Sequence, residues 1–256
     1  MDQPLLELKD VSLSYHSLEG ETPAISHISF QVPKGGFLAI VGPSGCGKST
    51  ILNLICGLLK PEEGEILLGG TSLSEKPMNI GYMLQKDHLF EWRTVYSNIL
   101  LGLETQKRVT PQKEVYIESL MQTYGLNSFK NAKPSQLSGG MRQRAALIRT
   151  LALEPDLLLL DEPFSALDYQ TRLNVGDDIG KIIKQEENTA ILVTHDISEA
   201  ISMADTVIVM TKRPATVKCT IPIDLELPDR TPLTSRSAPR FKTYFNQIWK
   251  ELNDHE

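Results

Sequence analysis

The chain has 256 residues, and its 26 lysines and arginines against 32 aspartates and glutamates give a formal net charge of −6. A chain of this length can bury a full hydrophobic core without disulfides or structural metals. The acidic balance argues against a surface built for nucleic acid, so we expect no nucleic-acid partner. Three cysteines, Cys46, Cys56 and Cys219, form no closely spaced pair, which argues against a zinc site or a disulfide scaffold and indicates a reducing compartment.

The N-terminal residues, MDQPLLELKD, contain no basic region followed by an apolar run, so they predict no signal peptide. The longest apolar stretches, such as the four leucines before Asp161, are too short to cross a bilayer. We therefore expect a cytoplasmic protein whose membrane role, where it has one, is peripheral and depends on a partner.

The first part of the chain is predicted to be rich in strands. Apolar and polar residues alternate there, with the apolar ones at Leu6, Leu8, Val11, Leu13, Tyr15, Ile28, Phe30 and Val32. This period of two is typical of an antiparallel sheet with one buried face. A short apolar strand, Phe37–Val41, then ends in a glycine-rich turn, and a helix is predicted over Ser49–Leu59, stopped before Pro61. Further strands are predicted at Gly64–Gly70 and Asn79–Gln85.

From about residue 92 to residue 152, polar helical patterns replace the strands, which indicates a helical subdomain inserted into an α/β core. The core resumes with Asp156–Leu160 and Thr189–Thr194. Strands that are apolar on both faces and alternate with helices indicate a parallel sheet covered on both sides. The tail, from about Pro228, contains an amphipathic helix whose apolar face carries Phe241, Tyr244, Phe245, Ile248, Trp249 and Leu252. This helix either packs on its own domain or serves a dimer or regulatory role.

The segment GPSGCGKST follows a strand, opens a helix and matches the phosphate-loop pattern G-x-x-x-x-G-K-[ST]. Its glycines let the backbone wrap a phosphate chain with N–H groups pointing inward, and the helix N-terminus adds partial positive charge. Lys48 would reach the terminal phosphates and Ser49 would bind Mg²⁺. The alternative is a glycine turn that merely precedes a helix. The predicted nucleotide-binding residues are Gly42, Pro43, Ser44, Gly45, Cys46, Gly47, Lys48, Ser49 and Thr50.

A second pair of functional residues ends the apolar run LLLLDEP. Asp161, at the end of a buried strand beside the phosphate loop, can hold Mg²⁺ through water. The adjacent Glu162 could orient or deprotonate the attacking water. The alternative is that these acids only cap the next helix.

The segment LSGGMRQR, Leu137–Arg144, places a serine and two glycines at the start of a basic helix, which makes a second anion-binding helix end. Alone, it is equally consistent with a solvated helix capped by Ser138. Lying between the phosphate loop and LLLLDE, it closely resembles the signature sequence of ATP-binding-cassette (ABC) ATPases. This resemblance covers about residues 5–228.

The resemblance implies a fold and a domain organisation. The fold is an α/β phosphate-loop (P-loop) NTPase core with a mostly parallel sheet, an N-terminal antiparallel β subdomain and an inserted α-helical subdomain. The nucleotide-binding domain would span residues 1–228, with the helical subdomain at about 92–152, and a tail would span 229–256.

The resemblance also implies further site residues. Gln85 is similar to the glutamine that contacts Mg²⁺ and the attacking water, and His195 to the switch histidine at the γ-phosphate. The loop Ser165–Asp168 resembles the loop that communicates across a dimer. Tyr15 resembles the aromatic residue that stacks on adenine, and the alternative is a core-facing strand residue. Glu162, His195 and Lys48 would then be the catalytic residues.

The assembly implied is a homodimer in which ATP on one copy's phosphate loop is closed over by Ser138, Gly139 and Gly140 of the other. The partners implied are integral-membrane permease subunits at the cytoplasmic face of the membrane and, indirectly, an extracytoplasmic substrate-binding protein. The rival functions are an ABC exporter, a soluble non-transport ABC ATPase, and a P-loop kinase or GTPase, which would not need LSGGMRQR together with a switch histidine.

Within the importers, the run Leu84–Ile99 and the turn at Arg213-Pro214 resemble the nitrate/sulfonate/taurine branch, some members of which serve pyrimidine or thiamine precursors. Gly36 and Glu91 depart from this branch, where glutamate and proline are common. Two aromatic residues beside Glu91 are either anchors for the permease or part of the helical core: Phe90 and Trp92.

Overall fold

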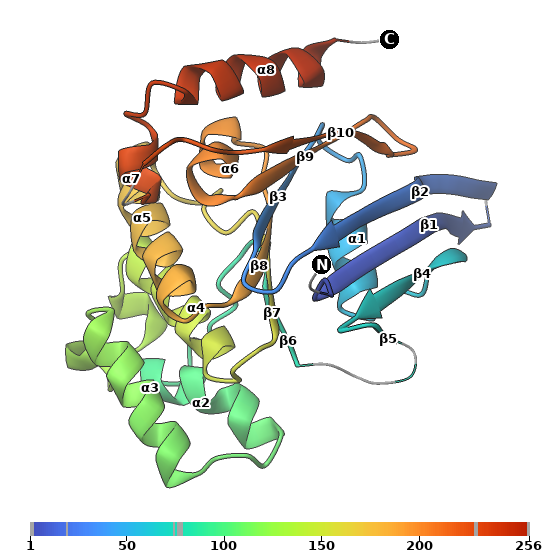
Figure 1. Ribbon diagram of the computed structural model, residues 1–256. Coiled ribbons are helices and arrows are strands. Elements are labelled where there is room, and N and C mark those ends of the chain that lie inside the picture. The colour runs from blue at the N-terminus through green and yellow to red at the C-terminus, as the bar shows by residue number, and fades with distance from the viewer. Residues whose placement is uncertain (1–2, 19, 74, 76–78, 228–229, 255–256) are drawn as a thin grey trace.

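The computed structural model describes residues 3–18, 20–73, 75, 79–227 and 230–254. Two sheets form its framework, a four-stranded sheet in the order β2-β1-β4-β5 and a six-stranded sheet in the order β10-β9-β3-β8-β7-β6 (Figure 1). The strands are β1 (Leu6–Ser17), β2 (Gly20–Val32), β3 (Phe37–Val41), β4 (Glu63–Leu68), β5 (Thr71–Ser72), β6 (Ile80–Met83), β7 (Leu157–Asp161), β8 (Thr189–Val193), β9 (Thr206–Met210) and β10 (Val217–Pro222).

Helices surround the six-stranded sheet. They are α1 (Lys48–Ile55), α2 (Val95–Thr105), α3 (Pro111–Thr123), α4 (Gly139–Leu151), α5 (Tyr169–Gln185), α6 (Ile197–Met203), α7 (Pro232–Ser235) and α8 (Phe241–Asn253), with short 3-10 turns at Asn127–Phe129 and Pro134–Gln136. Within the described ranges, none of the helices has the length and apolar character needed to cross a membrane.

The six-stranded sheet separates two hydrophobic clusters. Strands β3, β6, β7, β8 and β9 run parallel, and β10 pairs antiparallel with β9. Along β7, Leu158 and Leu160 enter the cluster that contains α2 to α6 and α8, while Leu157 and Leu159 enter the cluster that contains α1 and the N-terminal sheet. Since both faces are covered, every residue of β8 is buried, and the predicted parallel sheet is confirmed.

The N-terminal sheet is antiparallel, as the period of two predicts. Leu6 lies opposite Val32 and Leu8 opposite Phe30, and β1 also pairs antiparallel with β4. Helix α1 lies between this sheet and the six-stranded sheet (Figure 1), and its apolar residues join the cluster shared with both. Strand β3 is an interior strand of the six-stranded sheet, and the phosphate loop begins at its carboxyl end.

Several predicted boundaries are wrong by a few residues. Helix α1 ends at Ile55 rather than Leu59, because Gly57 has a φ of 75°, a left-handed conformation that ends helices. Strand β4 ends at Leu68, before a glycine turn. Strand β6 ends at Met83, so Gln85 lies in the loop beyond it rather than in the strand.

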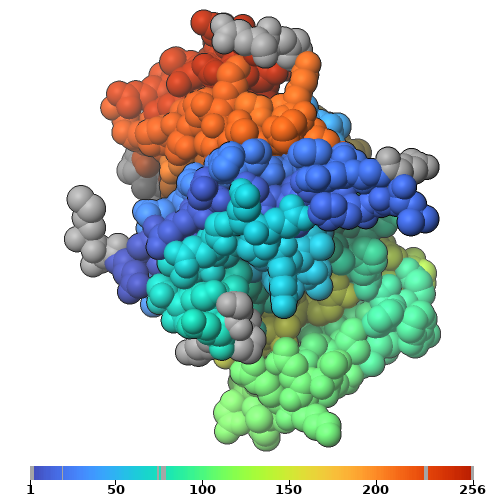
Figure 2. Space-filling view, turned by 90° about the vertical axis from the view of Figure 1, so that its right-hand side faces the viewer, coloured from blue at the N-terminus to red at the C-terminus, as the bar shows by residue number. Residues whose placement is uncertain are grey.

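Helices α2 and α3 lie at one end of the molecule (Figure 1), and α4 packs on α2, α5 and β6. In the space-filling view, the N-terminal sheet lies between this helical end and the C-terminal part (Figure 2). The predicted start of the tail, Pro228, is outside the described residues. The tail helix α8 packs on α6 and β9, with Ile248 fully buried and Trp249 exposed. The tail helix thus packs on its own domain.

Candidate functional site

The phosphate loop connects β3 to α1. Gly45 and Gly47 adopt φ values of 73° and 126°, which side chains disfavour, so the loop can turn tightly. Lys48 is only 7% exposed, and its ammonium donates hydrogen bonds to the carbonyls of Gly42 at 2.9 Å and Pro43 at 3.0 Å. Because Gly47 is the N-cap and has no side chain, the first N–H groups of α1 are left for an anion.

Asp161 ends β7 beside this loop. The Ser49 hydroxyl donates to Asp161 Oδ1 at 3.3 Å, and the Tyr82 hydroxyl donates to Asp161 Oδ2 at 3.3 Å. Burial raises the pKa of Asp161 above its ordinary value, although both hydroxyls and Lys48 favour its charged form. Hydroxyl and carboxylate oxygens are the ligands that Mg²⁺ prefers, so this donor set fits that ion. Among the described residues, no three His, Cys, Asp or Glu side chains cluster as a metal site.

Two other predicted site residues contact the Glu162 carboxylate. Gln85 Nε2 donates to Glu162 Oε2 at 3.3 Å, and His195 Nδ1 lies 3.2 Å from the same oxygen. Gln85 also donates to the Ser165 hydroxyl at 3.3 Å. Side chains from two other loops thus converge on the Glu162 carboxylate.

The backbone of Glu162 is held from both sides. Its N–H donates to Val193 O at 2.8 Å, and its carbonyl accepts from the backbone and hydroxyl of Ser165 at 3.2 and 3.0 Å. Its φ of 44° lies in the left-handed region, which is unusual for a residue with a side chain. Such a conformation persists only where the surroundings impose it, and these backbone hydrogen bonds impose it here.

Tyr15 is 40% exposed, and its hydroxyl lies 3.1 Å from Thr50 Oγ1 on α1. The ring therefore borders the phosphate loop and is not packed in the core.

The helix end of LSGGMRQR is exposed at Ser138 and Gly139. Ser138 caps α4 by accepting from the Met141 N–H at 3.3 Å. Gly140 is buried, and a Cβ there would come 2.7 Å from Val175 Cγ2 on α5. The absence of a side chain at Gly140 is thus already required by packing within the chain.

The aromatic pair Phe90 and Trp92 lies at the surface, with ring centroids 4.6 Å apart and Trp92 73% exposed. Trp92 is therefore not part of the helical core. Between them, Glu91 pairs with Arg142 of α4 at 2.9 Å, and the same guanidinium forms a fork with Asp87 at 2.9 and 3.2 Å. Glu91, where the resembled branch commonly has proline, thus forms an ion pair with the helix that Ser138 caps.

Sequence patterns did not indicate Tyr82, whose hydroxyl fixes Asp161, or Glu199, which supports the His195 segment. Glu199 Oε2 accepts from the Thr194 hydroxyl at 2.6 Å. Tyr82 lies on the same face of β6 as Ile80, so alternation placed it with the core. For Glu199 the only signal was its position four residues after His195, on the first turn of a helix.

Glu199 should make stability depend on pH. It is buried, and this burial raises its pKa from 4.5 to about 7. A carboxyl whose pKa is raised by folding holds its proton better in the folded state, so its contribution to stability falls as pH rises through this window. We expect the unfolding free energy of the wild type to fall by about 2 kcal/mol more than that of Glu199→Gln between about pH 5 and pH 8. Urea unfolding at several pH values measures this, and parallel curves would contradict it.

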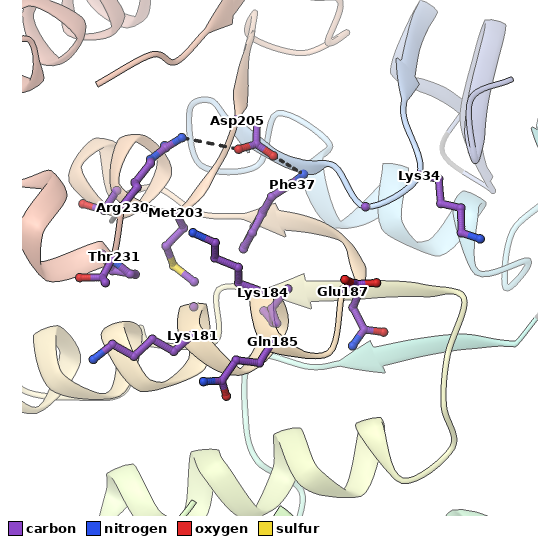
Figure 3. A pocket seen from close by; sticks show the side chains of 16 residues that line it. Lys34, Phe37, Lys181, Lys184, Gln185, Glu187, Met203, Asp205, Arg230 and Thr231 are labelled. Atoms are coloured by element: carbon purple, nitrogen blue, oxygen red, sulfur yellow. Dashed lines mark hydrogen bonds and ion pairs between the residues drawn. The ribbon is translucent and has the colours of Figure 1, made fainter. Parts of the chain in front are cut away.

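A groove of about 580 Å³ lies at the opposite end of β3, beside Phe37 (Figure 3). Part of its polar wall is paired within the chain. Arg230 lies 3.5 Å from Asp205, which in turn accepts from the Phe37 N–H at 2.9 Å, and Lys181 pairs with Asp177 at 2.6 Å. The groove is thus separate from the phosphate loop, which begins at the other end of the strand.

Comparison with known proteins agrees with this geometry. The family model described as ABC transporter matches residues 25–165. An uncharacterized ABC transporter ATP-binding protein of Bacillus subtilis, YtlC, is 45% identical over 251 residues, covering 98% of this chain and 96% of that protein. The aliphatic sulfonates import ATP-binding protein SsuB of Bacillus licheniformis is 37% identical over 236 residues, covering 92% and 89%.

Solved structures agree with the fold. The ATP-binding cassette MJ0796, a dimer in a post-hydrolysis state bound to ADP and Pi, matches with a TM-score of 0.73 and 30% identity, covering 86% of this chain and 99% of that chain. The cbiO1 protein of Clostridium perfringens, part of the ABC transporter complex cbiONQ, matches with a TM-score of 0.75 and 27% identity, covering 86% and 89%. The predicted cassette fold is confirmed. This chain belongs to the ABC transporter family, as an ATP-binding subunit that hydrolyses ATP.

Proposed function

We propose that the chain is the ATPase subunit of an importer that takes up a small anion or organic nutrient, such as an aliphatic sulfonate, nitrate or taurine, through a separate permease. Its similarity to the sulfonate import protein over most of both chains supports this most directly. Residues 1–228 would form the nucleotide-binding domain and residues 229–256 a tail packed on it. The subunit would lie at the cytoplasmic face of the membrane, with a substrate-binding protein acting on the permease from outside.

The site residues divide the chemistry of hydrolysis among them. Lys48 and the N–H groups of the phosphate loop would bind the β- and γ-phosphates of ATP, and Tyr15 would border adenine. Glu162 would accept a proton from the attacking water, which Gln85 would orient, while His195 would contact the γ-phosphate. Mg²⁺ held by Ser49, Asp161 and Gln85 would neutralise charge on the phosphates.

The two ATP sites would form between two copies, with the exposed helix end of Ser138 and Gly139 in one copy closing over Lys48 of the other. Mixed dimers test this arrangement. We expect a dimer with Lys48→Met in one subunit and Ser138→Arg in the other to keep one intact site. A dimer with both changes in the same subunit should keep none, because each change then damages a different site.

The measurement is the number of ATP molecules retained per dimer after gel filtration, in a background that does not hydrolyse ATP. The reverse pattern, with ATP retained only when both changes share a subunit, would show that each subunit binds ATP alone. Thermal melts of each homodimer serve as the folding control.

Docking of the permease would use the exposed aromatic pair Phe90 and Trp92, whose segment is joined to α4 through Glu91 and Arg142. The importer assignment is tested by purifying the permease and binding protein encoded beside this chain, reconstituting them in liposomes and measuring ATP hydrolysis. Stimulation by binding protein loaded with a sulfonate, nitrate or taurine supports the proposal. Stimulation of hydrolysis by solute in the absence of the binding protein, or no stimulation by any loaded binding protein, overturns it.

A further inference from the structure

Arg172, on the first turn of α5, lies between two loops of the site. Its Nη2 donates to the carbonyl of Leu167 at 3.1 Å, which holds the loop Ser165–Asp168. Its Nη1 lies 3.6 Å from Asp196 Oδ2, and its Nε lies 3.8 Å from Glu199 Oε1. With its side chain only 22% exposed, this one guanidinium links the loop after Glu162 to the segment that carries His195.

The segment around His195 is fixed to the first turn of α6 on both sides. Before it, the Thr194 hydroxyl donates to Glu199 and accepts from the Asp196 N–H at 3.0 Å. After it, Asp196 caps α6 by accepting from the Ser198 N–H at 2.7 Å. A force on Asp196 or Glu199 is therefore transmitted directly to the backbone on either side of His195.

One donor of the Arg172 guanidinium has no hydrogen bond. Arg172 Nε is buried and forms no hydrogen bond in the described structure, although Glu199 Oε1 is its nearest carboxylate partner at 3.8 Å. A buried donor without a partner is costly, so a displacement of about 1 Å that closes this contact would be favourable.

We propose that Arg172 is a positioning residue for ATP hydrolysis, which holds the loop Ser165–Asp168 and the His195 segment in a fixed relation across Glu162. Glu162 begins the turn that leads into this loop, and His195 contacts its carboxylate, so both ends of the link act on the same group. The inference rests on the proposed roles of Glu162 and His195 in hydrolysis, and it does not depend on import or on the solute. If two copies close over ATP as proposed, a contact that the partner copy makes with the loop Ser165–Asp168 would be transmitted through Arg172 to His195.

The test compares kcat and KM. Arg172→Met should lower kcat for ATP hydrolysis by about tenfold or more, while the KM for ATP changes less than about threefold, because the phosphate loop is untouched. Arg172→Lys should recover part of kcat, since it restores the charge without the fork.

Arg230→Met is the matched control. Arg230 also binds a backbone carbonyl, Ile201 O at 2.9 Å, lies 3.5 Å from a carboxylate, Asp205, and has a buried Nε without a hydrogen bond (Figure 3). Both variants should lose similar stability in thermal melts, but only Arg172→Met should lose kcat. Equal kcat values in the two variants would overturn the proposal.

A double-mutant cycle with Asp196→Asn separates positioning from general damage. Asparagine still caps α6 but carries no charge for Arg172 to bind. If Arg172 acts through Asp196, the two changes together should lower kcat little more than Arg172→Met alone. Strictly additive losses would mean that Arg172 acts by another route and would also overturn the proposal.

Discussion

Glu162→Gln should lower kcat for ATP hydrolysis by about a thousandfold, at the centre of the range for loss of a general base. The amide has the same shape as the carboxylate, so the contacts of Gln85 and His195 at 3.3 and 3.2 Å can persist, but it cannot accept a proton from water. ATP binding should survive because Lys48 and the phosphate loop are unchanged. ATP should therefore accumulate, unhydrolysed, in a dimer.

The measurement is steady-state release of phosphate together with gel filtration in the presence of ATP. Glu187→Gln is a matched control, because Glu187 is an exposed glutamate with a similar left-handed φ of 51° beside the groove at the other end of the sheet. This control should keep wild-type turnover. Turnover retained by Glu162→Gln would remove Glu162 from the role of base.

Lys48→Met should weaken ATP binding by about a hundredfold or more, since charge-assisted hydrogen bonds contribute about 1.5–3 kcal/mol each. The substitution removes the cation that reaches the phosphates. It also leaves the carbonyls of Gly42 and Pro43 without the donor that holds them at 2.9 and 3.0 Å. Both the charge and the shape of the loop are then lost.

Lys34→Met provides the comparison for Lys48→Met. Lys34 is exposed and precedes β3, whereas Lys48 follows it, so the two lysines lie beyond opposite ends of one strand. Titration with a fluorescent ATP analogue should give the wild-type Kd for Lys34→Met. A Kd for Lys48→Met within about threefold of the wild type would show that the loop backbone alone binds the phosphates.

Sequence patterns locate a candidate site best where its residues lie close together in the chain. The phosphate loop and the two acids after LLLL are each a short contiguous segment, so their residue types and order predict their chemistry. Helix α1 was predicted too long because its end depends on the left-handed conformation of Gly57 rather than on Pro61.

Residues that act by holding others were missed. The Tyr82 hydroxyl and Asp161 are 79 positions apart, and alternation alone makes Tyr82 a core residue. Arg172 of α5 and Asp196, the N-cap of α6, are similarly brought together only in the folded chain. Contacts of this kind depend on the tertiary arrangement, which no local pattern encodes.

The left-handed backbone at Glu162 lowers the stability of the fold, whereas the proposed catalytic role requires a glutamate at this position. A side chain in this conformation costs about 1 kcal/mol, which glycine would not incur. Laboratory evolution for heat resistance alone, with no requirement for ATP hydrolysis, should therefore tolerate or enrich glycine at this position. Restoring a requirement for ATP hydrolysis should remove such lineages, because glycine has no carboxylate to accept a proton from water.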